Sequence, residues 1–331
     1  MVTLKDIANE AGVSIMTVSN VINGKFSKVS EKNITNIQRI VQKYNYIPNS
    51  AARSLSSRNS RIIALFVPDG EYENPHYVGA FNSIAHEIYD RNYYLMVFSN
   101  INPEENLSNL KTWNVDGVIC FPPLNNEAFN FFINTGIPTC FIDSYQEAPN
   151  ILKVGLDDFR GGYLAGNYLA KNGHSEVGFA SYHTDFDYIL KMRLDGFKKA
   201  LEDNGLILKK ENIYVANTTF EGGIDVANQL IDKNSSITGI LATEDQMAIG
   251  IMEGARQNGI SVPAQLSVIG FDNIPLCEYV TPKLTTISQD ITQKGKYAAE
   301  MLLNLLEKGV VENKNIKMPL RIVERQSVIH R

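Results

Sequence analysis

Apolar residues recur at helical spacing from the first residues of the chain. A helix is predicted to begin near Leu4, because Thr3 and Asp6 have the spacing of a capping box. Gly12 follows the last apolar position of this helix and suits a tight turn with a positive φ. The residues expected to face the core of this segment are Leu4, Ile7, Ala8 and Ala11.

Two further helices are predicted before residue 46. Ser14 is placed to cap a second helix over residues 15–23, and a third helix is predicted over residues 30–45. Two short helices joined by a glycine turn and braced by a third form a helix-turn-helix unit, whose second helix enters the DNA major groove. The expected core residues of these two helices are Val18, Val21, Ile22, Ile34, Ile37, Val41 and Tyr44.

From residue 61 onward, continuous apolar runs alternate with amphipathic segments. Such runs are typical of parallel strands covered by helices on both faces, so an α/β fold is predicted. About 270 residues exceed what one core usually holds, so we expect two lobes that bind ligand beyond the C-terminal ends of their strands. Strands are predicted over residues 61–67, 94–98, 117–121, 139–143, 176–181, 213–216, 239–242 and 267–271. Helices are predicted over residues 77–91, 103–113, 190–204, 222–233, 245–258 and 294–307.

The composition is that of an ordinary globular protein, with 44% hydrophobic and 20% charged residues, and it excludes disordered, collagen-like and coiled-coil classes. Three cysteines without a CxxC pair and five scattered histidines indicate no disulfide framework and no metal site. The chain has no dinucleotide fingerprint after its first strand, no phosphate-binding P-loop and no GxSxG elbow, so neither a cofactor nor an enzyme activity is expected. No apolar run is long enough for a membrane span and the N-terminus lacks a secretory signal, so a cytoplasmic protein is expected.

Charge is distributed unevenly along the chain. Residues 1–61 carry nine Lys or Arg and three Asp or Glu, a net charge of +6, although the whole chain has a net charge of −5. A basic first segment on an acidic body indicates that this segment binds a polyanion such as DNA. A solvated basic face is the alternative that charge alone leaves open.

Specific motifs add to these patterns. The strings TLKDIANEAGVS, TVSNVING and YIPNSAARSL resemble the DNA-binding headpiece of the LacI/GalR family of bacterial transcription regulators. The body, including VDGVI at residues 115–119 and SVIGFDN at residues 267–273, resembles the effector domain of that family, which is similar to periplasmic sugar-binding proteins. The resemblance implies a small all-α helix-turn-helix headpiece over residues 1–47, a hinge helix or linker over residues 48–60, and a two-lobed effector-binding and dimerisation domain with parallel sheets over residues 61–331.

The resemblance also implies which headpiece residues bind DNA. Ile15 and Met16 are the pair that determines specificity on the second helix. The family usually has Arg where this chain has Asn20, and Asn binds adenine better than guanine, unless Asn20 touches only the DNA backbone. The implied DNA-binding residues are Thr3, Ser14, Ile15, Met16, Thr17, Ser19, Asn20, Asn23, Tyr44, Asn49, Ala52, Arg53 and Leu55.

The segment after Pro48 is polar and rich in small residues, and its ten residues are too few for a stable isolated helix. By resemblance it is a hinge helix that folds on DNA beside its twin. Leu55 then enters the minor groove and kinks the duplex, while Ala52 allows close approach and Arg53 lies near a phosphate.

By resemblance, a small molecule binds between the two lobes, with Arg193 and Asp272 at the two most dependable effector positions of the family. An Arg fork and a carboxylate suit neighbouring hydroxyls or an anionic group. The alternatives are a salt bridge between the lobes for Arg193, a cap of the next turn for Asp272, and a place in the core for Tyr77. The implied effector-binding residues are Asp69, His76, Tyr77, Asp143, Arg193, Glu244, Asp272 and Gln289.

We therefore expect a homodimeric repressor that binds a pseudo-palindromic double-stranded DNA operator under the control of a small-molecule effector, a sugar or sugar phosphate. The missing leucine-heptad tail favours a dimer over a tetramer. Within the family, the alternative is control by a phosphoprotein co-repressor or a purine. A sugar-binding protein without a DNA function is the other alternative, which the basic first segment disfavours. No metal and no membrane partner are expected.

Overall fold

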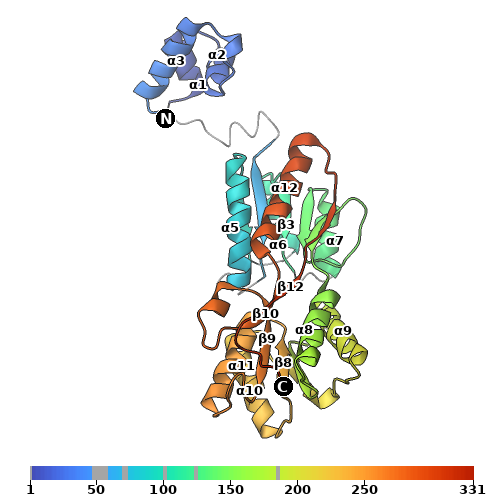
Figure 1. Ribbon diagram of the computed structural model, residues 1–331. Coiled ribbons are helices and arrows are strands. Elements are labelled where there is room, and N and C mark those ends of the chain that lie inside the picture. Colours follow the sequence, from blue (N-terminus) through green and yellow to red (C-terminus); the bar gives the residue numbers. More distant parts are fainter. Residues whose placement is uncertain (1, 47–58, 69–73, 100–102, 123–125, 184–186) are drawn as a thin grey trace. The chain divides into compact units, whose positions relative to one another are not determined.

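A computed structural model describes residues 2–46, 59–68, 74–99, 103–122, 126–183 and 187–331 (Figure 1). The chain divides into two compact units, Met1–Ser60 and Arg61–Arg331. None of the helices described is both long and apolar enough to cross a membrane.

The described residues of the first unit form three α-helices and a short 3₁₀ turn. Thr3 and Asp6 form the predicted capping box, and the Ser14 side chain accepts a hydrogen bond from the backbone of Thr17. Gly12 ends the first helix with φ 69°, as the turn requires. The elements are α1 (Leu4–Ala11), α2 (Ile15–Ile22), η1 (Phe26–Lys28) and α3 (Glu31–Lys43).

Apolar side chains from all three helices close the core of this unit. Ile7, Val18, Ile37 and Ile40 are fully buried. The prediction that Tyr44 faces this core is wrong, because its side chain is 39% exposed and Ile40 occupies the buried position on α3. The helix ends at Lys43, so Tyr44 leaves the helical register on which the prediction depended.

The second unit contains two six-stranded sheets, which confirms the prediction of two lobes with parallel sheets. The first sheet has the order β11-β5-β4-β3-β1-β2, and all its neighbouring strands are parallel. Its strands are β1 (Ile62–Phe66), β2 (Tyr94–Phe98), β3 (Gly117–Cys120), β4 (Thr139–Ile142), β5 (Leu152–Gly155) and β11 (Asn315–Lys317). The accompanying helices are α5 (Pro75–Asp90), α6 (Pro103–Thr112), α7 (Asn126–Thr135) and α12 (Ile291–Lys308), of which α5 and α12 pack side by side.

The second sheet has the order β12-β10-β9-β8-β6-β7 and is parallel except for the antiparallel edge strand β12. Its strands are β6 (Val177–Ser181), β7 (Ile213–Val215), β8 (Gly239–Ala242), β9 (Ser267–Asp272), β10 (Thr285–Ser288) and β12 (Arg321–Val323). In Figure 1, helices α8 and α9 pair beside this sheet, as do α10 and α11. These helices are α8 (Asp158–Lys171), α9 (Tyr188–Asp203), α10 (Phe220–Asp232) and α11 (Asp245–Gln257), with 3₁₀ turns η3 (Lys210–Asn212) and η4 (Pro275–Glu278).

The chain passes between the two lobes three times. It crosses after β5, again between β10 and α12, and finally between β11 and β12. Gln289 lies in the second crossing, so this candidate effector residue belongs to the segment that joins the lobes. Lobes that are joined by several short connecting segments can rotate against each other about those segments.

Helices α8 and α9 approach each other closely because two glycines form the contact. A Cβ atom at Gly162 would lie 1.8 Å from the carbonyl oxygen of Arg193, and one at Gly196 would lie 1.9 Å from that of Phe159. Any larger residue would force the helices apart. This contact holds the first turn of α8 against the part of α9 that carries Arg193.

Candidate functional site

The first turn of α2 exposes two large apolar side chains. Ile15 is 48% exposed and Met16 is 73% exposed, while Val18 and Val21 on the same helix are buried in the core. Exposed apolar groups at the start of such a helix can contact thymine methyl groups in the major groove. Asn20 is half-buried on the same helix.

Several of the polar residues predicted to bind DNA have hydrogen-bond partners within the first unit. The Ser14 and Thr17 hydroxyls lie 2.9 Å apart, and Asn23 donates to the backbone oxygen of Ser19 at 2.8 Å. The Thr3 hydroxyl donates to Asp6 at 2.7 Å, which helps to hold the pKa of that carboxyl below its usual value. These contacts fix the two ends of α2 and the start of α1, the surfaces that would meet DNA.

Tyr44 joins the ends of two helices. Its hydroxyl donates to one carboxylate oxygen of Glu10, and Lys43 donates to the other at 2.8 Å. These two hydrogen bonds hold the pKa of Glu10 below its usual value.

Five other predicted residues lie outside the described residues, namely Asn49, Ala52, Arg53, Leu55 and Asp69.

A cavity of about 340 Å³ lies between the lobes of the second unit. Both lobes line it, with residues that follow strands of each sheet, as expected for ligand binding in an α/β fold. The structure brings seven of the predicted effector residues together here, namely His76, Tyr77, Asp143, Arg193, Glu244, Asp272 and Gln289. Further lining residues include Asn74, Tyr182, Asp187 and Thr218.

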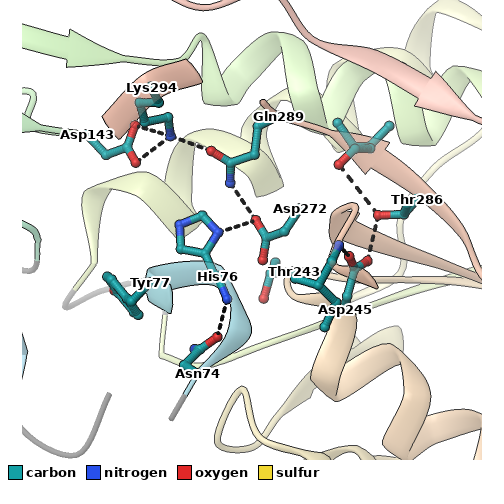
Figure 2. A network of polar contacts seen from close by, with 12 residues as sticks. Asn74, His76, Tyr77, Asp143, Thr243, Asp245, Asp272, Thr286, Gln289 and Lys294 are labelled. Carbon is teal, nitrogen blue, oxygen red and sulfur yellow. Dashed lines mark hydrogen bonds and ion pairs between the residues drawn. The ribbon is translucent and has the colours of Figure 1, made fainter. Parts of the chain in front are cut away.

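A chain of polar contacts links the lobes through this cavity (Figure 2). Asp143, at the end of β4, accepts from the Lys294 ammonium at 2.6 Å and 2.8 Å. Lys294 also donates to the Gln289 amide oxygen, and the Gln289 amide nitrogen donates to Asp272 at the end of β9. Lys294 is fully buried, so Asp143 supplies its countercharge and Gln289 supplies a further hydrogen-bond acceptor.

Asp272 adopts an unusual backbone conformation at the end of β9. Its φ is 116°, and the next residue, Asn273, has a φ of 64°. Strained backbone of this kind clusters at ligand sites. Burial raises the pKa of Asp272 well above its usual value, with repulsion from Asp245 and Glu244 adding to the rise against the attraction of Arg193.

His76 faces the same carboxylate from α5. Its Nδ1 lies 3.5 Å from Asp272 Oδ1, which is too long for a good hydrogen bond, and this buried nitrogen has no hydrogen-bond partner. Burial, together with the charges of Lys294 and Arg193, holds the pKa of His76 well below its usual value, so the ring is neutral at pH 7. A neutral imidazole nitrogen here can accept from or donate to a ligand hydroxyl.

Arg193 is held by its own lobe. Its Nε donates to Asp158 at 2.9 Å, its Nη1 donates to the Thr243 carbonyl at 2.7 Å, and its guanidinium carbon lies 3.6 Å from the Phe271 ring centre. Arg193 does form a salt bridge, but its partner Asp158 lies on α8 in the same lobe. The salt bridge therefore does not join the two lobes. The guanidinium still lines the cavity.

Tyr77 lies both against the core and in the lining of the cavity. Its ring packs edge-on against Phe121 and also lines the cavity. The Asp272 carboxylate accepts from Gln289, so it is not used only as a cap.

Two residues of this site were not predicted from the sequence, Asp158 and Lys294, which compensate the charges of Arg193 and Asp143.

A second polar cluster lies behind Asp272, as Figure 2 also shows. Asp245 is fully buried and accepts from the Thr286 hydroxyl at 2.6 Å, the Ile274 backbone at 2.8 Å and the Cys277 thiol at 3.1 Å. Burial raises the pKa of Asp245 to about 6. Through these contacts Asp245 ties the start of α11 to β10 and to the turn that follows β9.

Comparison with known proteins identifies the family. The sequence model of the bacterial regulatory proteins of the lacI family matches residues 3–49, and that of the periplasmic binding protein-like domain matches residues 167–328. The NTD biosynthesis operon regulator NtdR of Bacillus subtilis (strain 168) is 30% identical over 334 residues, covering 99% of this chain and 100% of NtdR. The chain belongs to the LacI family.

Other LacI-family proteins match over most or nearly all of the chain. The transcriptional repressor PurR of Vibrio atlanticus (strain LGP32) is 31% identical, with 99% of each chain covered. The lac repressor dimer bound to operator and the anti-inducer ONPF superposes with a TM-score of 0.88 at 25% identity, covering 99% of each chain. A LacI-family regulator of Enterococcus faecium with bound ribose has a TM-score of 0.73 at 30% identity, covering 81% of this chain and 99% of that one. This LacI-family chain is thus a DNA-binding transcriptional regulator with a small-molecule effector.

Proposed function

We propose that the protein is a homodimeric repressor whose two headpieces bind a pseudo-palindromic operator, and that a sugar-like effector in the cleft controls this binding. One observation carries the proposal: the chain combines a helix that exposes Ile15 and Met16 with a polar cleft built from both lobes of its body. The half-sites are then centred about 34 Å apart, one turn of DNA.

Control of DNA binding needs a difference in affinity between two states of the body. The cleft supports this because its ligand-facing groups, such as His76 and Glu244, come from different lobes, so a ligand that contacts both stabilises one degree of closure. We propose that residues 48–60 transmit this closure as a hinge. A coupling of about 1–3 kcal/mol changes operator affinity roughly 5- to 150-fold.

Selection from a random duplex library with the full-length protein tests the DNA function. We expect an enriched palindrome, and an adenine at the position that Asn20 contacts. Asn20→Arg should move the preference at that position to guanine, whereas Asn9→Arg, the same change on the exposed side of α1, should leave the selected sequence unchanged. Enrichment of no sequence, by the protein alone and with a cell extract that supplies any co-repressor, would refute the proposal.

Leu55→Ala tests the hinge. If Leu55 enters the minor groove, this variant loses affinity for the selected operator but keeps its salt-dependent affinity for random DNA. Equal losses on both DNAs would contradict this role. A gel-shift titration at two salt concentrations separates the two outcomes.

Calorimetric titration of the selected complex with sugars, purines and a phosphorylated carrier protein tests the effector. Binding of a sugar-like molecule with a shift in operator affinity supports the proposal. A response only to a purine or to the phosphoprotein would replace the effector class and leave the DNA function in place.

A further inference from the structure

Lys294 places a positive charge directly behind the wall of the cleft. It lies in the first turn of α12 and is fully buried. Lys294 is not among the residues that line the cavity, although its partners Asp143 and Gln289 are. A buried ion pair rarely stabilises a fold more than apolar side chains of similar volume would. Packing alone therefore does not account for a Lys at this position.

The Lys294 ammonium has no hydrogen left for a ligand. An ammonium group carries three donors and no acceptor. Lys294 donates to Asp143 Oδ1 at 2.8 Å, to Asp143 Oδ2 at 2.6 Å and to the Gln289 amide oxygen, as Figure 2 shows. It can therefore act on a ligand only through these two residues.

The first effect of Lys294 is on the charge of Asp143. Burial raises the pKa of Asp143, and the Lys294 ammonium opposes this rise, helped by Arg193 on α9 and countered by Asp158 on α8. Lys294 occupies one lone-pair position on each carboxylate oxygen, which leaves the others for the cavity that Asp143 lines. An ionised Asp143 offers a ligand only hydrogen-bond acceptors.

The second effect is on the orientation of the Gln289 amide. Its oxygen accepts from Lys294, so its nitrogen donates to Asp272. Reversing the amide would point its hydrogens at the ammonium and its oxygen at the carboxylate, and both contacts would be repulsive. An amide nitrogen carries two hydrogens, and within the described part of the chain only Asp272 accepts one, so the other is available to a ligand.

We propose that Lys294 is a positioning residue for the effector: it keeps Asp143 an acceptor and Gln289 a donor on one wall of the cleft. This inference rests on the proposed function of the cleft as an effector site. Both residues contact the same ammonium, so they lie close enough for neighbouring groups of one ligand. Two adjacent hydroxyls of a ring fit this arrangement, because a hydroxyl both donates and accepts. An ionised phosphate or carboxylate has no hydrogen for Asp143 and is repelled there.

Variants of the full-length protein test the charge that Lys294 supplies. In Lys294→Met, Asp143 has no countercharge and should take up a proton on folding. The free energy of unfolding of this variant should then fall more steeply than that of the wild type as the pH is raised from about 4. Adding Asp143→Asn removes the group that binds this proton and should remove the extra fall. Asp245 titrates in both variants and cancels in the comparison.

Two further variants control this comparison. Lys296→Met makes the same change at an exposed position of α12 and should follow the wild type. If Lys294→Met does not fold, Lys294→Gln takes its place, because it keeps a donor for Asp143 without the charge. Each variant is also titrated with the selected operator, which shows that it folds and binds DNA.

Calorimetry tests the effect on the ligand. The probes are ribose, glucose, galactose, cellobiose and myo-inositol, each titrated at about pH 6 and about pH 8. For a probe that binds the wild type, we expect Lys294→Met to lose roughly 10-fold more affinity than the wild type at the lower pH. The reason is that protonation of Asp143 replaces a charge-assisted hydrogen bond with a neutral one. A Lys294 with only a structural role would lower stability and leave the pH dependence of binding unchanged.

Four results would overturn the assignment. They are binding of none of the probes, a pH dependence of binding in Lys294→Met equal to that of the wild type, an extra pH dependence that survives Asp143→Asn, and equal pH slopes of stability in Lys294→Met and the double variant. These outcomes do not touch the proposed DNA function, which fails only if no operator is selected. A protein that selects an operator but binds none of the probes therefore refutes the inference alone.

Discussion

Replacing Arg193 by Met tests the ion pair that supports the cleft. Arg193 is 6% exposed and Asp158 is 1% exposed, so the substitution leaves a buried carboxylate without its countercharge. Breaking a buried pair from one side costs about 3–5 kcal/mol. The Tyr145 hydroxyl still donates to Asp158 at 2.8 Å, so we expect the lower part of that range, about 3 kcal/mol.

The assay is urea denaturation followed by far-UV circular dichroism. Lys191→Met is the matched control, because Lys191 lies on the same helix and its pair with Asp195 is exposed, where such pairs contribute about 0–1 kcal/mol. Asp158→Asn in the Arg193→Met background removes the uncompensated charge and should restore a large part of the lost stability. The double-mutant cycle then measures the coupling between the two residues directly.

Two results would refute this reasoning. A loss below about 1 kcal/mol for Arg193→Met would mean that Asp158 finds water or another partner at little cost. No recovery on adding Asp158→Asn would mean that the loss comes from packing on Phe271 and not from the charge. The same measurement decides how a failed effector response in an Arg193 variant is interpreted, because a loss of lobe stability also abolishes the response.

Four further changes test other parts of the structure. Gly162→Ala should destabilise the chain by about 1–3 kcal/mol or more in urea denaturation, because its Cβ would lie 1.8 Å from a backbone oxygen, whereas a Cβ at Gly79 would lie 3.0 Å from a side-chain methyl group of Ile291, so Gly79→Ala should cost less. Lys294→Met should weaken the response to effector and destabilise the chain, since Asp143 loses its buried partner; an unchanged response in operator titrations would exclude the polar chain from signalling. The pKa of Asp245 rises from 3.8 to about 6 on folding, so between these pH values the folded chain keeps a proton that the unfolded chain releases. The free energy of unfolding therefore falls as the pH is raised from about 4 to about 6. Asp245→Asn should flatten this part of the stability curve, and an identical slope in both proteins would assign the proton elsewhere.

The first unit could be predicted closely from local signals. Capping residues and a glycine turn act within one helix and its neighbour, so Thr3, Ser14 and Gly12 fix the helix limits in the sequence itself. Tyr44 is the exception. The apolar periodicity of α3 continues through Tyr44, but the helix already ends at Lys43.

Helix α8 was missed because its residues disfavour a helix in isolation. Gly161, Gly162 and Gly166 each weaken a helix by about 1 kcal/mol relative to Ala. The structure uses them for close contacts with Phe271 and with the backbone of α9, a tertiary gain that no local pattern contains. Missing α8 also meant missing Asp158, the partner of Arg193.

Short strands near one edge of each sheet were missed for a different reason. Strands β5, β10, β11 and β12 have only three or four residues, and β10 consists largely of Thr and Ser. Such short segments have no clear hydrophobic pattern, and β11 pairs with β5, which lies far earlier in the sequence. The predicted order of strands and helices was therefore incomplete at the crossings, and it also lacked α7, the helix between β3 and β4.

Only some residues of the cleft could be predicted from the sequence. Residues at the ends of buried strands, such as Asp143 and Asp272, are predictable because parallel strands place their C-terminal ends at one edge. Lys294 is not, since a Lys in the first turn of an amphipathic helix normally lies at the surface. It is fully buried here because Asp143, 151 residues earlier, accepts from it at 2.6 Å.

This pairing bears on how the ligand signal would leave the cleft. Gln289 joins Lys294 to Asp272 and lies in a crossing between the lobes, so a ligand that hydrogen-bonds to the same oxygen of Asp272 would compete with Gln289 for it. If Gln289 then shifts, Lys294 keeps its charge compensated only by staying with Asp143. We therefore expect rearrangement of the crossing and closure on the ligand to be coupled, because Asp272 lies at both. Packed elements that have two discrete arrangements, instead of deforming gradually, amplify small local shifts of this kind.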